Sequence, residues 1–145
     1  MDYDKKELET YISDNGYKPS IAYIDGIVKA LDGDKNVVGY VITVTDKEGY
    51  GGNIQFTIGI QSDGTINGVS FLSIEETAGV GMKAKENKFK SQFEGRKVDS
   101  FEYTKNGATA DNQIDAISGA TITTNAVTNG VNTGILAYKF VMEAN

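Results

Sequence analysis

Hydrophobic and polar residues alternate most regularly in the middle of the chain. Positions 54, 56, 58 and 60 are all Ile or Phe and are separated by polar residues or glycine, which is the period-2 pattern of a half-buried strand. Similar runs rich in β-branched and aromatic residues occur on both sides. The predicted strands are Ala22–Leu31, Val37–Asp46, Ile54–Gln61 and Ile66–Ile74. Short polar turns at 32–36 and 62–65 predict antiparallel hairpins, and hence a three- or four-stranded meander.

Helical spacing appears at the two ends of the chain. Leu8, Tyr11 and Ile12 predict a short helix over Asp4–Asn15, which ends at an Asn-Gly pair. The longest predicted helix is Thr123–Glu143. Its apolar stripe consists of Val127, Val131, Ile135 and Tyr138, the spacing by which one face of a helix is buried.

The same long helix carries small residues at four-residue intervals, namely Ala126, Gly130 and Gly134. A glycine inside a helix costs about 1 kcal/mol relative to alanine. We therefore expect a packing reason for these residues: a flat face that lets the helix lie close against the sheet.

The remaining segments have weaker patterns. We expect a short helix over Glu86–Phe93, a possible edge strand over Val98–Thr104 and a polar loop over Asn106–Ile117. Residues 47–53 and 75–82 are glycine-rich connections. Together the elements predict an α+β fold, in which a twisted antiparallel meander packs against a long C-terminal helix and short helices. With 145 residues, the chain is expected to form one domain, 1–145.

Composition excludes several classes of function. The chain has no cysteine and no histidine, which removes thiolate chemistry, Ser-His-Asp catalysis and most zinc, haem and iron–sulfur sites. The net charge is −6, and no basic patch is visible, which argues against binding to nucleic acid.

The segment Asp115–Thr121 precedes the long predicted helix. The first turn of a helix offers N–H groups without intrahelical partners and favours an anion such as phosphate. Gly119 permits close approach of a backbone. Hydroxyl groups are supplied by Ser118, Thr121, Thr123 and Thr124. The alternative is that a threonine merely caps the helix.

Asp115-Ala116-Ile117-Ser118-Gly119-Ala120-Thr121 resembles the flavinylation motif, Asp-x-x-Ser-Gly-Ala-Thr, of the FMN-binding domain family. That family occurs in the G subunits of Rnf ferredoxin:NAD oxidoreductases and in the C subunits of sodium-pumping NADH:quinone reductases. The resemblance implies that a flavin transferase attaches FMN to the Thr121 hydroxyl as a phosphoester. It also implies that Asp115 and Ser118 present the motif, while Gly119 and Ala120 keep the attachment point uncrowded. Residues 106–109 (Asn-Gly-Ala-Thr) are a partial copy that lacks the serine and the aspartate.

Two further blocks resemble the same family. Glu76-Thr77-Ala78-Gly79-Val80-Gly81 is similar to its Glu-Thr-Pro-Gly-Leu-Gly loop and departs at Ala78 and Val80. Gly49-Tyr50-Gly51-Gly52 is similar to its glycine-tyrosine turn. The resemblance implies that Thr77 and the loop backbone bind the flavin, that Val80 lies against the ring and that Tyr50 contacts its edge. Alternatively, Glu76 and Thr77 belong to a solvated loop and Tyr50 to the core.

The resemblance implies an electron-transfer domain, not a catalyst acting alone. It would be the soluble part of a membrane-bound, ion-translocating complex whose other subunits are its partners. We favour an Rnf-type complex over a quinone reductase, and expect the extracytoplasmic face of the membrane. An anchoring N-terminal helix is expected in the native protein and is missing from this chain. Alternatives are an extracellular flavin-bearing lipoprotein or reductase module, and a non-redox binding module.

Overall fold

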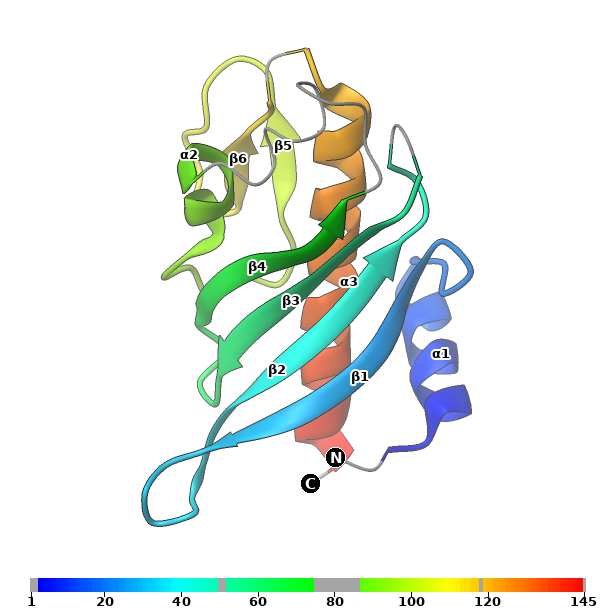
Figure 1. The fold of residues 1–145 in the computed structure, drawn as a ribbon, viewed down its shortest axis with the longest axis vertical. Coiled ribbons are helices and arrows are strands. Elements are labelled where there is room, and N and C mark those ends of the chain that lie inside the picture. The colour runs from blue at the N-terminus through cyan, green and yellow to red at the C-terminus, as the bar shows by residue number, and fades with distance from the viewer. Residues whose placement is uncertain (1–2, 50–51, 75–86, 118, 145) are drawn as a thin grey trace.

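The computed structural model describes residues 3–49, 52–74, 87–117 and 119–144. Four antiparallel strands form a sheet in the order β1-β2-β3-β4 (Figure 1). These strands are β1 (Ala22–Leu31), β2 (Val37–Asp46), β3 (Ile54–Gln61) and β4 (Ile66–Ile74). The α+β fold and the predicted meander are thus confirmed, and all four strands have the predicted bounds.

Helices cover one face of this sheet. In Figure 1, α3 runs along that face and α1 lies beside it, next to β1. The helical elements are α1 (Lys5–Asp14), α2 (Asn87–Lys90), the 3-10 turn η2 (Ser91–Phe93) and α3 (Thr121–Ala144). A second, two-stranded parallel sheet pairs β5 (Glu102–Thr104) with β6 (Gln113–Asp115). Between β4 and α3, the chain builds this small sheet beside the first turns of α3 (Figure 1).

The core forms where the inward side chains of the sheet meet α3. In β2 and β3, Ile42 lies opposite Ile58, and Val44 lies opposite Phe56. All four side chains are fully buried, as are Val127 and Val131 on the predicted stripe of α3. Strict alternation therefore sends every second residue of these strands into the core.

The helix approaches the sheet closely at two glycines. A Cβ atom on Gly130 would lie 2.7 Å from Cζ of Phe56, and one on Gly134 would lie 2.6 Å from Cδ1 of Ile58. Ala126, one turn earlier, is fully buried. The expected small-residue face is confirmed, because a Cβ atom at either point would require the Phe56 ring or the end of the Ile58 side chain to shift.

Three sequence-based boundaries were wrong. Of the predicted edge strand Val98–Thr104, only the last three residues form a strand, β5. The predicted loop Asn106–Ile117 contains the strand β6. A three-residue strand with one apolar residue, Ile114, is too short to show a period. The long helix begins at Thr121 and not at Thr123, because the carbonyl of Ala120 already accepts the amide N–H of Thr124.

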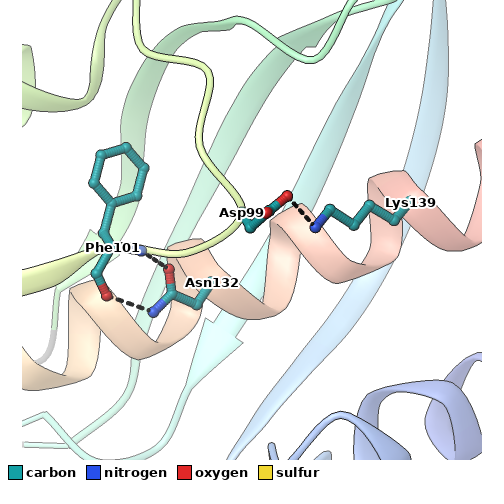
Figure 2. A network of polar contacts seen from close by, with 4 residues as sticks. All are labelled: Asp99, Phe101, Asn132 and Lys139. Carbon is teal, nitrogen blue, oxygen red and sulfur yellow. Dashed lines mark hydrogen bonds and ion pairs between the residues drawn. The ribbon is translucent and has the colours of Figure 1, made fainter. Parts of the chain in front are cut away.

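Just before β5, the backbone of Phe101 is hydrogen-bonded by a side-chain amide instead of by a neighbouring strand. Asn132 of α3 accepts the N–H of Phe101 at 2.7 Å and donates to its C=O at 2.9 Å (Figure 2). Nearby, Lys139 forms an ion pair with Asp99 at 2.7 Å (Figure 2). These contacts fix the segment that leads into the small sheet onto the middle of α3.

Asp46, at the end of β2, is a fully buried carboxylate. Its oxygens accept the backbone N–H of Glu48 at 2.8 Å and the side-chain amide of Asn129 at 3.2 Å. Burial raises the pKa of Asp46 to about 6; the negative charge of Glu48 also raises it, while the two hydrogen bonds lower it. Asp46 therefore ties the end of β2 to α3. Because burial disfavours the ionised carboxylate, its charge at neutral pH lowers the free energy of unfolding.

Substitution of Gly130 tests the close packing of α3. We expect Gly130→Ala to lower the free energy of unfolding by about 1–3 kcal/mol, because overpacking against the Phe56 ring outweighs the gain in helix propensity. Chemical denaturation of Gly130→Ala, Phe56→Leu and the double variant measures the coupling. The cost of Gly130→Ala should shrink in the Phe56→Leu background, and strictly additive effects would contradict the contact.

Asp46 should make stability depend on pH in a defined window. Its folded pKa of about 6 exceeds the ordinary value of 3.8, so the folded state binds more protons between those values and the wild type loses stability as pH rises through them. Asp46→Asn has no such loss. Relative to the wild type, we expect Asp46→Asn to gain about 1–3 kcal/mol between pH 4 and pH 7.5. The free energy of unfolding is measured by chemical denaturation at each pH. A difference between the two proteins that stays constant from pH 4 to pH 7.5 would contradict the prediction.

Candidate functional site

A tight turn leads into the first residue of α3. The N–H of Ala120 donates to the C=O of Ile117 at 3.0 Å and closes the turn. Gly119 has a φ of +74°, a left-handed conformation that glycine adopts without strain. Ala120 itself is buried. Gly119 and Ala120 therefore act here through backbone conformation and packing, while Ser118 lies outside the described residues.

The hydroxyl of Thr124 holds this turn against the helix. It donates to the C=O of Ala120 at 2.9 Å and accepts the N–H of Ile117 at 3.0 Å. Thr124 is fully buried, and so is Thr123. The two predicted site residues Thr123 and Thr124 thus face the interior, and Thr124 has a structural task.

Thr121 differs from both of these threonines. It is half-buried, and in the part of the chain that the structure describes its hydroxyl makes no hydrogen bond. The backbone N–H groups of Thr121 and Ile122 likewise have no acceptor among the described residues, as expected for a first helical turn. Capping does not explain Thr121, because the residue that precedes the helix is Ala120.

Ile122 adds an apolar surface beside this hydroxyl. Its side chain is 51% exposed, although it stands one turn before Ala126, on the helix face that packs on the sheet. Ile122 was not singled out from the sequence, because its spacing from Ala126 predicts a buried position and not an exposed one.

Asp115 is held at three atoms. Its carboxylate accepts the N–H of Ala108 at 2.7 Å. Its own N–H donates to Oε1 of Gln92 at 2.6 Å, and its C=O accepts from Nε2 of Gln92 at 3.1 Å. Gln92 was not singled out from the sequence, because only the tertiary fold brings position 92 beside position 115.

The partial copy of the motif at 106–109 has a different environment. The hydroxyl and the backbone N–H of Thr109 both donate to Oε1 of Gln113 at 3.1 Å. The Thr109 hydroxyl is therefore engaged, whereas that of Thr121 has no partner within residues 3–49, 52–74, 87–117 and 119–144. This difference agrees with the interpretation that 106–109 is not the attachment motif.

The other two blocks lie largely outside the described residues. This applies to the predicted site residues Tyr50, Glu76, Thr77, Gly79, Val80 and Gly81. The strand ends next to them are described: Asp46 pairs with Ile54, and Ile54 pairs with Ile74. These ends lie at the same end of the sheet as the first turns of α3 (Figure 1).

Neither a metal-binding cluster nor a membrane-spanning helix is found within the described ranges. No three His, Cys, Asp or Glu side chains there gather into a metal-binding cluster. No helix in those ranges has both the length and the apolar character needed to cross a membrane.

Comparison with curated proteins finds relatives among components of ion-translocating complexes. The chain is 34% identical over 136 residues to the G subunit of the Na⁺-translocating ferredoxin:NAD⁺ oxidoreductase complex of Acetobacterium woodii, covering 92% of this chain and 64% of the relative. It is 37% identical over 106 residues to the G subunit of the proton-translocating complex of Clostridium ljungdahlii, covering 73% and 56%. The chain thus spans about three fifths of the length of these relatives.

Solved structures and a family model agree with this result. NqrC of Shewanella oneidensis superposes with a TM-score of 0.66 at 18% identity, covering 99% of this chain and 76% of that one, which shows a shared fold. The model of the FMN-binding domain matches residues 49–135, more than half of the chain, including all three sequence blocks and the first part of α3. The chain therefore belongs to the FMN-binding domain family.

Proposed function

We propose that residues 1–145 form one electron-transfer domain that carries FMN covalently, as a phosphoester on the hydroxyl of Thr121. One observation carries the choice of residue. Of the three threonines in the first turn of α3, two are fully buried, and only Thr121 is half-exposed with a hydroxyl that is unengaged among the described residues. A hydroxyl that accepts a bulky group must be both reachable and uncommitted.

The surroundings of Thr121 fit a phosphate ester. The N–H groups of Thr121 and Ile122 point out of the first helical turn, where the helix dipole favours negative charge. No lysine or arginine lies in residues 115–125, so noncovalent affinity for the phosphate from this segment would be modest. A covalent bond retains the cofactor without requiring tight noncovalent binding.

The attachment step balances as a transfer from FAD. The bond between Oγ1 of Thr121 and the flavin-side phosphorus forms as the pyrophosphate bond of FAD breaks, AMP leaves and the hydroxyl proton passes to a base. A flavin transferase would be the catalyst and a partner during maturation. Thr124 and Gly119 would shape the turn that the transferase meets, with Ser118 and Asp115 as parts of the recognised motif.

When attached, FMN supplies the redox chemistry, and the protein supplies attachment, orientation and polarity. Ile122 offers apolar surface next to the attachment point. We propose that Tyr50 and the loop containing Glu76, Thr77, Gly79, Val80 and Gly81 complete the flavin site. The convergence of the strand ends at Asp46, Ile54 and Ile74 supports this, because those ends adjoin the two segments.

We further propose that the domain belongs to a membrane-bound, ion-translocating oxidoreductase and exchanges electrons with its other subunits at the extracytoplasmic face. The names of the two G-subunit relatives support such a host. The C subunit of the Na⁺-translocating NADH-quinone reductase of Pasteurella multocida is 38% identical over 78 residues but covers 48% of this chain. An Rnf-type host is therefore favoured over a quinone reductase, because the alignments with the G subunits are longer.

Intact-mass measurement tests the attachment residue. After co-expression with a flavin transferase, we expect a gain of one FMN minus water, about 438 Da. Thr121→Val should abolish the gain, because it removes the attacking oxygen and keeps a similar shape. Thr109→Val serves as the matched control and should be labelled like the wild type. Equal labelling of the two variants would overturn the assignment.

A further inference from the structure

The side chain of Gln92 pairs with Asp115 as a strand would. Its amide accepts the N–H of Asp115 at 2.6 Å and donates to the C=O of the same residue at 3.1 Å. On the other edge of β6, β5 already forms the parallel pair. Both edges of β6 are therefore occupied at Asp115, one by a strand and one by a glutamine.

The backbone that Gln92 holds leads directly to the attachment point. After Asp115, the N–H of Ala116 donates to the C=O of Thr104 at 2.9 Å. The next N–H, of Ile117, donates to the hydroxyl of Thr124 at 3.0 Å. Three consecutive amides are thus fixed by three different elements, and the turn to Thr121 follows.

Gln92 can act as an anchor because its neighbour in η2 is fixed. Phe93 is fully buried and packs with its ring centroid 5.7 Å from that of Phe89 and 5.0 Å from that of Phe101. The backbone of η2 therefore belongs to the core, while the amide of Gln92 extends from it toward β6. The hydrogen bonds of Gln92 therefore tie η2 to Asp115 of the motif.

We propose that Gln92 is a positioning residue for flavin attachment: its amide fixes Asp115, and through it the register of the segment that presents the Thr121 hydroxyl. The inference rests on the proposed function. The hydrogen bonds of Gln92 among the described residues go to the backbone of Asp115 and not to Thr121. It acts by keeping the motif in the one conformation that a transferase has to recognise.

The rate of flavin attachment is the measurement that tests this role. Purified chain, excess flavin transferase and FAD are mixed, and labelling is followed by intact mass over time. We expect Gln92→Ala to slow attachment about tenfold, as the loss of two hydrogen bonds to a presented motif would. The matched control is Gln61→Ala, which removes an amide that donates to Asn67 in the β3–β4 hairpin and should leave the rate unchanged.

A second variant distinguishes positioning from a general loss of folding. In Gln92→Glu, an ionised carboxylate can accept the N–H of Asp115 but repels its C=O, whereas a protonated carboxyl can bond to both. Relative to the wild type at each pH, attachment to Gln92→Glu should therefore recover as the pH falls from 7.5 to about 5, toward the range where a glutamate titrates. At pH values and temperatures where circular dichroism shows the variant to be fully folded, a change in bulk stability leaves the attachment rate unchanged, so a recovery measured there reports positioning.

The outcomes separate the two claims. A wild-type chain that takes up no flavin overturns the proposed function and this inference with it. A wild-type chain that is labelled, together with Gln92→Ala labelled at the same rate and Gln92→Glu without pH dependence, overturns the role of Gln92 and leaves Thr121 as the attachment residue.

Discussion

Close contact between α3 and the sheet is the constraint on which the rest of the structure depends. At Gly130 and Gly134 the space that a side chain would fill is already taken by Phe56 and Ile58. The helix can therefore lie against β3, and the apolar stripe of α3 seals the core. Because an α-helix is rigid over this length, fixing its middle also fixes the position of its first turn. Thr121 is placed by packing that occurs more than two turns away.

Polar side chains of α3 also hold neighbouring segments in place. Asn129 binds the buried carboxylate of Asp46 at the end of β2, and Asn132 binds the backbone of Phe101 ahead of the small sheet (Figure 2). The end of β2 and the segment before β5 are thus both held by side chains of the same helix. In the first turn of α3, the hydroxyl of Thr124 bonds to Ile117 and Ala120, whereas the hydroxyl of Thr121, the proposed attachment point, has no hydrogen-bond partner among the described residues.

The sequence predicted those parts of the fold that rest on a repeated pattern. The four strands show clear alternation or β-branched runs, and the stripe and small face of α3 follow helical spacing, so their places and roles were correct. Short β6 has a single buried apolar residue, Ile114, and shows no period. The pairing of Gln92 with Asp115 joins residues 23 positions apart, and the elevated pKa of Asp46 follows from burial by α3. Such features arise from tertiary contacts that no local pattern records.

The proposed attachment motif could be found from the sequence because it is a continuous string of residues, and its resemblance to the family already pointed to Thr121. The structure adds that Thr123 and Thr124 are buried. Peptide mapping of the flavin-bearing protein tests the choice of Thr121 most directly. Trypsin should release Asn106–Lys139 as one peptide, which holds Thr109, Thr121, Thr123 and Thr124 together, and fragmentation can assign the FMN to one of them. We predict FMN on Thr121 and on no other residue. Flavin on a different side chain, or flavin that leaves the protein on denaturation, would contradict it.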